Sequence, residues 1–313
     1  MDICNTASEG RMGTLIGASR VGKRFVVDLA ARKYPANERD GRRITPILRV
    51  NVPSEASIGS VLDRLLNAVG APVVARERNG QMFDRFLRFA KLCEVRVIVL
   101  DEFQHLADIR GSDRQSVCNT IKALMNDGHV GVLAVGMLEA QDVFMSDPQL
   151  MGRSVANIRL YPFCDSQNPS LSGPDGEENY AAEFSEYRGV LKIFGEKLGN
   201  SDVSFLVSRD VAEEILKFTD GCIGRILNLV EVAMQISKEN GKAKIDQVSL
   251  DAAMKQLSFP KRDASNVPII RGEIRGNRRG RMSRTERQER SAKGEFKSTI
   301  PSEVADADDG EAT

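Results

Sequence analysis

The stretch Met12-Gly-Thr-Leu-Ile-Gly-Ala-Ser-Arg-Val-Gly-Lys-Arg24 joins a short apolar segment to a glycine-framed loop and the start of a helix. Within it, Gly17, Gly22 and Lys23 have the G-x-x-x-x-G-K spacing of a phosphate-binding loop. Two glycines allow the backbone to curl so that successive N–H groups point at phosphate oxygens, and the helix N-terminus adds partial positive charge. The stretch therefore predicts a nucleotide site. The residues expected around the phosphates are Gly17, Ala18, Ser19, Arg20, Val21, Gly22, Lys23 and Arg24.

Arg24 stands where a Ser or Thr hydroxyl normally binds the magnesium ion of such a loop. Its fixed charge close to a divalent cation is unfavourable by roughly a few kcal/mol at an effective dielectric near 20, unless the side chain points away. Two hypotheses therefore stay open. The protein hydrolyses ATP, or it binds nucleotide as an adaptor without turnover.

The second motif is the acidic pair Asp101-Glu102, which follows the apolar run Val95–Leu100. A continuous apolar run is typical of a central parallel strand, and we expect this strand to neighbour that of the phosphate loop. Asp101 is then expected to bind Mg²⁺, and Glu102 to orient and deprotonate the attacking water. Acids also end buried strands merely as caps, but the order of the two motifs along the chain favours an NTPase site.

Strand and helix patterns alternate through the first half of the chain, which predicts an α/β domain with a parallel sheet and right-handed crossovers. The predicted strands cover residues 12–17, 44–52, 95–100 and 131–136 and part of 151–160, and the predicted helices cover 24–33, 54–70, 80–92 and 114–126.

Composition divides the chain into four parts. Residues 1–164 form the predicted nucleotide-binding domain, and 165–179, rich in Ser, Pro, Gly and acids, a predicted mobile linker. Residues 180–259 show about four helical patterns and no strand pattern, and we expect them to form a helical lid. Residues 260–313 lose apolar periodicity, which predicts a disordered tail that is basic and then acidic.

Two arginines are further candidates. Arg153 precedes the last strand, where many ring-forming ATPases present an arginine to the nucleotide of a neighbouring subunit. Arg225 opens a helix of the predicted lid and could fold back on the phosphates. Met137, at the end of a strand, is poorly suited to sensing a phosphate. The arginines of the tail could neutralise DNA phosphates or simply be solvated.

The overall composition limits the possible partners. Formal net charge is zero, so attraction to nucleic acid must come from a local patch. The five cysteines have no metal-ligand spacing and no disulfide pattern, which indicates a reducing compartment. Without a long apolar run or leader pattern, we expect a soluble, cytoplasmic protein with no membrane partner.

The sequence resembles the TniB family of AAA+ ATPases, which are TnsC-like regulators of DNA transposition. The resemblance spans roughly residues 12–258 and rests on the phosphate loop and on a series of later segments. These are Val50-Asn-Val-Pro-Ser-Glu55, Leu65-Leu-Asn-Ala-Val-Gly-Ala-Pro72, Val97-Ile-Val-Leu-Asp-Glu102, Val132-Leu-Ala-Val-Gly136 and the Gly-Cys-Ile-Gly run before Arg225.

The resemblance implies a P-loop NTPase fold with ATP and Mg²⁺ as cofactors. It further implies a homo-oligomeric ring or filament on duplex target DNA that recruits or activates a DDE transposase. Family members carry a further N-terminal segment, so the short lead before Met12 suggests a truncated copy. A helicase loader or secretion-type ATPase of the same fold remains an alternative, because function depends on sites and partners.

Overall fold

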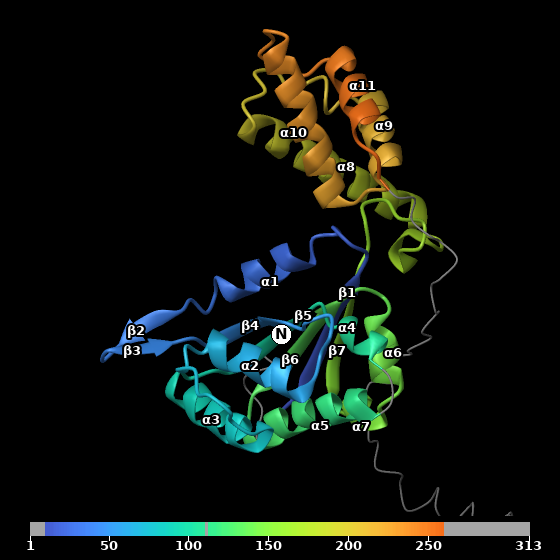
Figure 1. Cartoon of the computed structure of the whole chain (residues 1–313). Helices are drawn as coiled ribbons and strands as arrows, with labels where there is room; N and C mark the ends of the chain where they lie inside the picture. Colours follow the sequence, from blue (N-terminus) through green and yellow to red (C-terminus); the bar gives the residue numbers. More distant parts are fainter. Residues whose placement is uncertain (1–9, 110–111, 260–313) are drawn as a thin grey trace, which may run out of the picture. The chain divides into compact units, whose positions relative to one another are not determined.

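Five parallel strands form the central sheet of the protein, in the order β4-β5-β6-β1-β7 (Figure 1). The computed structural model describes residues 10–109 and 112–259, all within one unit, Met1–Ser265. Parallel pairing and the crossovers between strands confirm the predicted fold class. The strands are β1 (Met12–Gly17), β4 (Ile47–Asn51), β5 (Val97–Asp101), β6 (Gly131–Gly136) and β7 (Ser154–Leu160).

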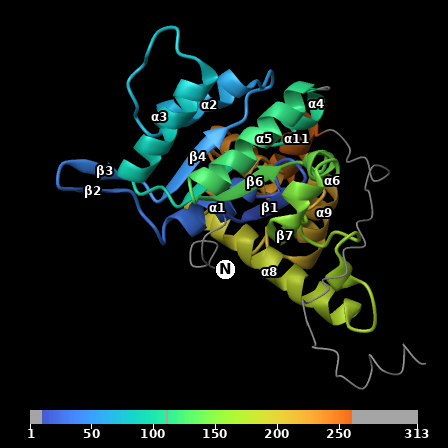
Figure 2. The same cartoon turned by 90° about the horizontal axis from the view of Figure 1, so that it is seen from below.

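Helices cover both faces of this sheet. Helices α2 (Ile58–Ala68), α3 (Asn79–Leu92) and α5 (Ser112–Asp127) lie on one face, as Figure 2 shows from that side, and α1 (Lys23–Ala31) lies on the other. Successive residues of a strand point to opposite faces of the sheet. Ile98 and Leu100 pack in the hydrophobic core under α2 and α5, whereas Val97 and Val99 pack in the core under α1. This alternation follows from the two-residue repeat of a strand.

The position of β5 corrects one prediction. We expected the strand that ends in Asp101 to neighbour the strand of the phosphate loop, but β6 pairs with both and lies between them. Chain order cannot reveal this, because a crossover helix allows the next strand to leave a gap that a later strand fills. Asp101 and the phosphate loop still meet, since the carboxyl ends of parallel strands share one edge of the sheet.

Sequence periodicity missed several short elements. Between the predicted helix 24–33 and the predicted strand 44–52 lies an antiparallel hairpin of β2 (Asn37–Arg39) and β3 (Arg42–Ile44). Three helices of four to six residues were also missed: α4 (His105–Asp108), α6 (Ala140–Met145) and α7 (Pro148–Gly152). Elements this short present less than two turns or a few alternations, so their pattern does not stand out.

A separate hydrophobic core organises the helical region, whose four long helices match the helical patterns expected there, while its role as a lid stays a prediction. Buried Tyr187 anchors it by donating its hydroxyl to the carbonyl of Ala212, 3.0 Å away. A 3-10 turn, Pro169–Leu171, and the start of α8 fall inside residues 165–179, for which composition predicted a linker. The predicted tail lies outside the described residues. The lid helices are α8 (Gly176–Lys197), α9 (Arg209–Thr219), α10 (Ile223–Glu239) and α11 (Gln247–Gln256).

Among the helices in the described part of the chain, none is both long and apolar enough to cross a membrane.

Candidate nucleotide-binding site

The phosphate loop follows β1 and ends where α1 begins. Gly22 has a φ of 104°, a conformation that favours glycine, and it occupies the N-cap of α1. Gly17 is required for a different reason, because an added Cβ would lie 2.6 Å from the carbonyl oxygen of Leu160 on β7. The two glycines therefore have distinct roles. One turns the loop into the helix, and the other lets it run close to the neighbouring strand.

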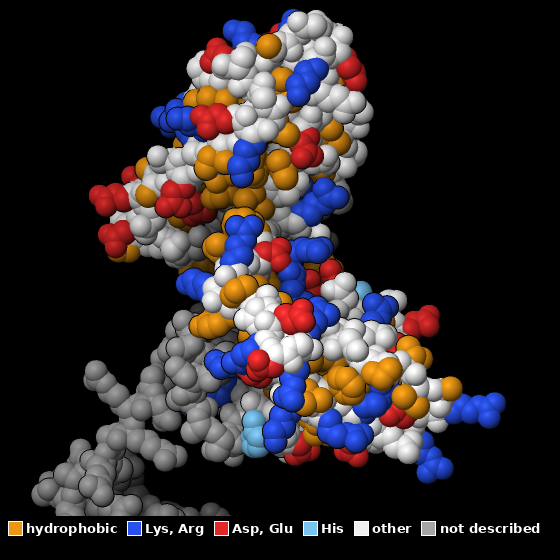
Figure 3. All heavy atoms as spheres, turned by 90° about the vertical axis from the view of Figure 1, so that its left-hand side faces the viewer, with side chains coloured by type: hydrophobic (Ala, Val, Ile, Leu, Met, Phe, Trp, Pro, Cys, Tyr) orange, Lys and Arg blue, Asp and Glu red, His pale blue; other side chains and the backbone are white. Residues whose placement is uncertain are grey.

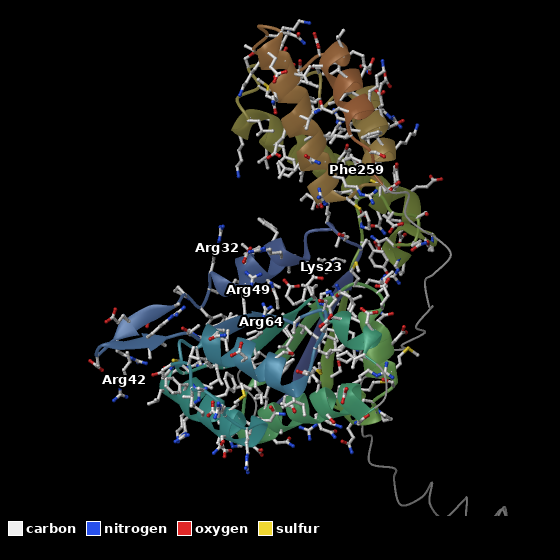
Figure 4. The ribbon with its side chains drawn as sticks, in the orientation of Figure 1. Lys23, Arg32, Arg42, Arg49, Arg64 and Phe259 are labelled. Atoms are coloured by element: carbon white, nitrogen blue, oxygen red, sulfur yellow. The ribbon has the colours of Figure 1, made fainter. Side chains whose placement is uncertain are left out.

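Lys23 folds back over this loop (Figure 4). Its ammonium donates hydrogen bonds to the carbonyls of Gly17 and Ala18, both at 2.8 Å. Burial lowers the pKa of Lys23, while the nearby carboxylates of Glu102 and Asp101 oppose that shift. The lysine is thus held at the loop and within electrostatic reach of the acidic pair, and its contact with phosphate stays a prediction.

Asp101 and Glu102 form that acidic pair at the carboxyl end of β5. The Asp101 carboxylate accepts the backbone N–H of Glu102 at 3.0 Å. Glu102 has a φ of 57°, in the left-handed region that non-glycine residues rarely adopt, and Phe103 then donates its N–H to the carbonyl of Val135 on β6. This turn leaves the Glu102 side chain exposed beside the lysine.

The described residues contain no group of three His, Cys, Asp or Glu side chains that could hold a metal ion. A magnesium ion here would therefore depend on Asp101 together with phosphate oxygens and water, as Mg²⁺ commonly does in nucleotide sites.

Arg24 is exposed to solvent. Its side chain is exposed on the first turn of α1, and within the described residues it makes no hydrogen bond or ion pair with Asp101 or Glu102. The charge that the sequence placed beside the expected cation is therefore solvated. What the loop loses at this position is the hydroxyl ligand.

Backbone contacts join the lid to the phosphate loop. The N–H of Gly224, at the start of α10, donates to the carbonyl of Arg20 at 2.9 Å. A Cβ at Gly224 would lie 3.0 Å from the Cβ of Arg20, so the glycine allows this approach. Before the helix, Gly221 and Phe163 pair through the Phe163 N–H and the Gly221 carbonyl at 3.0 Å.

Arg225 lies beside the phosphate loop, on the first turn of α10. Its guanidinium pairs with Asp220 at 2.6 Å and lies 5.4 Å from the ring centroid of Phe259. The side chain also lines a pocket of about 380 Å³ together with Ser19 and Arg20 of the phosphate loop. The contact between Arg225 and phosphate remains a prediction.

Arg153 is remote from the other candidate residues. It directly precedes β7, and its carbonyl accepts the N–H of Met12 at the first residue of β1. The phosphate loop lies at the other end of β1, six residues and roughly 20 Å away at the usual rise of a strand. Its guanidinium donates to Asn126 at 2.5 Å. Arg153 therefore cannot serve the site of its own chain, and its role toward a neighbour remains a prediction.

A pocket of about 430 Å³ adjoins the phosphate loop on the lid side. Its volume lies within the usual range of small-molecule sites. Its lining mixes apolar side chains with a few polar ones, and residue patterns alone gave no sign of it because its walls come from five separate segments. The lining includes Val21, Phe25, Phe163, Asn179, Glu183 and Ile223.

Gln104 is another residue that the sequence analysis missed. Its side chain, 6% exposed, donates to the carboxylate of Glu102 and accepts the N–H of Met137 at 3.0 Å. His105 beside it contacts the carbonyl of Val52 through Nδ1 at 2.8 Å. The signal was present as two polar residues, Gln104 and His105, separated from the acidic pair by Phe103, and a helix start would explain them equally well.

Solved structures of other proteins have the same fold. The chain resembles ORC2 of Aeropyrum pernix (ADPNP–ADP complexes) at a TM-score of 0.57 and 13% identity, covering 81% of this chain and 63% of that one. Cdc6p of Pyrobaculum aerophilum gives 0.56 and 14%, covering 83% and 64%. ORC1 of A. pernix in complex with DNA gives 0.52 and 18%, covering 80% and 60%. The chain thus spans less than two thirds of the length of these structures.

The chain belongs to the TniB family. The family model of the bacterial TniB protein matches residues 2–161, about half of the chain, which include the phosphate loop and the acidic pair. The lid lies beyond the matched residues. A search of the curated proteins finds no match.

Proposed function

We propose that this protein binds ATP with Mg²⁺ at the phosphate loop and uses that site to control its assembly on target DNA during transposition. The observation that carries the proposal is the meeting of Lys23, Asp101 and Glu102 at one edge of the sheet, in a chain of the TniB family. The family favours transposition over the helicase-loading and secretion roles that the fold alone would allow.

The residues present suit the nucleotide. The loop amides and Lys23, whose ammonium already binds two carbonyl oxygens, would hold phosphate oxygens. The pocket next to Gly22 would take the base and ribose, with Phe25 and Ile223 giving apolar contact. Asp101 would hold the metal ion, which when bound would neutralise charge that develops on the phosphates. Glu102 would accept the proton of the attacking water.

Two arginines, Arg153 and Arg225, would complete the site. Arg153 lies at the far edge of the sheet, where only a neighbouring copy could bring it to a nucleotide. Arg225, on the lid helix that contacts Arg20, would report the nucleotide state to the lid. The role of Arg153 requires an oligomer, which is why we propose a ring or filament with a transposase as its downstream partner.

Basic side chains outside the tail support a DNA contact. Figure 3 shows Lys and Arg side chains gathered on one face, with acidic residues among them, and Figure 4 labels four arginines on that side of the molecule. Arg39 and Arg49 are paired with Glu94 and Asp28, whereas Arg42 and Arg43 on the β2–β3 hairpin are exposed. Such side chains can neutralise backbone phosphates and release counterions.

The test measures nucleotide binding and turnover separately. Titration with a fluorescent ATP analogue in Mg²⁺ should show binding that Lys23→Ala abolishes, and hydrolysis should be measured with and without duplex DNA. Binding with DNA-stimulated turnover is expected. Absence of binding by the wild-type chain would overturn the proposal as a whole.

A second candidate function is a nucleotide-binding adaptor without turnover, which the missing magnesium-binding hydroxyl at Arg24 favours. Binding with negligible turnover in both DNA conditions would support it over the hydrolytic role.

A further inference from the structure

The side chain of Glu102 is held by a buried amide. Gln104 donates from Nε2 to the Glu102 carboxylate, and its Oε1 accepts the N–H of Met137 at 3.0 Å. The amide orientation follows from chemistry, because a flipped side chain would set its NH₂ against the Met137 N–H and its oxygen against a carboxylate. The amide therefore joins the end of β5 to the end of β6.

The end of β6 is shaped around this amide. A Cβ at Gly136 would lie 2.8 Å from Oε1 of Gln104 and 3.3 Å from its backbone nitrogen. Gly136 has no positive φ, so the glycine is needed for space and not for its backbone conformation. The space it leaves is occupied by Gln104.

The backbone around Gln104 is fixed on both sides. Glu102 is in the left-handed conformation, Phe103 donates its N–H to Val135 at 2.9 Å, and the fully buried Phe103 ring stacks on Phe144 at 4.9 Å between centroids. Because the main chain is anchored, the Gln104 side chain has few accessible rotamers, and its Nε2 donates to the Glu102 carboxylate. A fixed amide restricts the rotamers open to an exposed carboxylate.

We propose that Gln104 is a positioning residue, which orients Glu102 toward the attacking water and couples that orientation to the end of β6. The proposal rests on the hydrolytic role of Glu102 proposed above. The Met137 side chain cannot bond a phosphate, but its backbone N–H is bound by Gln104. A shift of this strand end would thus move Glu102 through a single amide.

The test compares Gln104→Leu, of similar size but without hydrogen bonds, with the wild-type protein. Turnover number should fall by about 10- to 100-fold while the dissociation constant for the ATP analogue changes less than about twofold. Gly136→Ala should reproduce the loss by displacing Oε1. Gln141→Leu on α6, where a half-buried glutamine has an Oε1 without a hydrogen-bond partner, is the matched control and should leave turnover unchanged.

Gln104→Glu separates positioning from packing. When ionised, the new carboxylate repels Glu102. When protonated, its O–H can donate to Glu102 while its carbonyl accepts from Met137, which restores the original pattern. The activity of Gln104→Glu relative to wild type should therefore rise as pH falls, and a purely structural role would leave that ratio flat.

The outcomes distinguish the two proposals. Normal turnover in Gln104→Leu, or a flat pH ratio in Gln104→Glu, would overturn the role of Gln104 while leaving ATP hydrolysis in place. A wild-type protein that binds nucleotide but does not turn it over would instead remove the hydrolytic role of Glu102, and that of Gln104 with it.

Discussion

At the scale of single residues, we expect Arg24 to determine whether the proposed site hydrolyses ATP. Its side chain is solvated, so it leaves room for a cation, but it supplies no oxygen ligand. Serine would restore that ligand and remove a positive charge from the first turn of α1, where cations are unfavourable.

Arg24→Ser is therefore expected to raise Mg²⁺-dependent turnover by about tenfold, which corresponds to about 1.4 kcal/mol of transition-state stabilisation. Phosphate release measured across a Mg²⁺ titration checks this, with Arg24→Ala separating the added hydroxyl from the lost charge. Equal turnover in the serine variant and the wild type would contradict the importance of the missing ligand.

Glu102 has a left-handed backbone conformation, which is unfavourable for a residue with a Cβ. A left-handed conformation costs an L-residue roughly 1–2 kcal/mol, a cost that alanine shares and glycine avoids. Both Glu102→Ala and Glu102→Gly should abolish turnover, but the glycine variant should be more stable than the alanine variant by about 1 kcal/mol. Urea unfolding of the two variants provides the measurement, and an alanine variant at least as stable would show that the strain is absent.

At the scale of secondary structure, a buried ion pair fixes the helices that precede Arg153. Lys122 on α5 bonds the carboxylate of Asp147 at 2.9 Å, and both side chains are nearly inaccessible. Asp147 also accepts the N–H groups of Gln149 and Leu150, and so caps α7. The pair thereby sets where β7 begins.

Burial raises the pKa of Asp147, but hydrogen bonds from Lys122 and the Leu150 N–H outweigh it and hold the pKa below its ordinary value. A depressed folded pKa adds stability above the unfolded value, near 3.9, and that stability is lost as pH falls through the folded pKa. Asp147→Asn should destabilise the protein by about 3 kcal/mol at neutral pH, because Lys122 stays buried without its counter-charge. Unfolding curves at several pH values should show this difference shrinking below about pH 4, and a constant difference would contradict it.

The contact between α10 and the phosphate loop gives a second prediction at this scale. Gly224→Ala would press on Arg20 and should weaken nucleotide binding several-fold, although alanine is the better helix former. Gly189→Ala in α8 is the control, because its Cβ meets nothing within 4 Å. That variant should gain about 0.5–1 kcal/mol of stability with unchanged affinity. Unchanged affinity in Gly224→Ala would show that the loop does not depend on the lid contact.

Long elements and the order of motifs could be predicted from sequence, whereas contacts between elements could not. The apolar run before Asp101 gave the strand, but its place beside β6 depends on a crossover that no local pattern records. The residues of the phosphate loop follow from spacing alone. Gln104 was missed because its meaning depends on Met137, which lies 33 residues away.

At the scale of the whole molecule, zero net charge means that the proposed binding of DNA would require a local basic surface. The exposed arginines of the β2–β3 hairpin are the described residues we expect to contribute. Replacing Arg42 and Arg43 with Glu should weaken ATP-dependent assembly on duplex DNA. The dependence of log binding constant on log salt concentration should become shallower by the amount expected for the loss of about two phosphate contacts. Sedimentation with DNA at several salt concentrations gives the measurement.

Arg209→Glu with Lys217→Glu on α9 is the matched control, since it changes the charge equally on another element. Equal losses in both double variants would indicate a general charge effect and contradict a hairpin surface.

The helical region meets the nucleotide-binding domain through main-chain atoms, at Gly224 with Arg20 of the phosphate loop and at Gly221 with Phe163 after β7. These contacts require glycine, because an added Cβ at Gly221 would lie 2.2 Å from the Phe163 carbonyl oxygen. The surrounding residues are then free to diverge without breaking these contacts. We therefore expect related chains to keep these backbone contacts even where their lid sequences differ. An analysis of correlated substitutions would not detect such contacts, because no pair of side chains makes them.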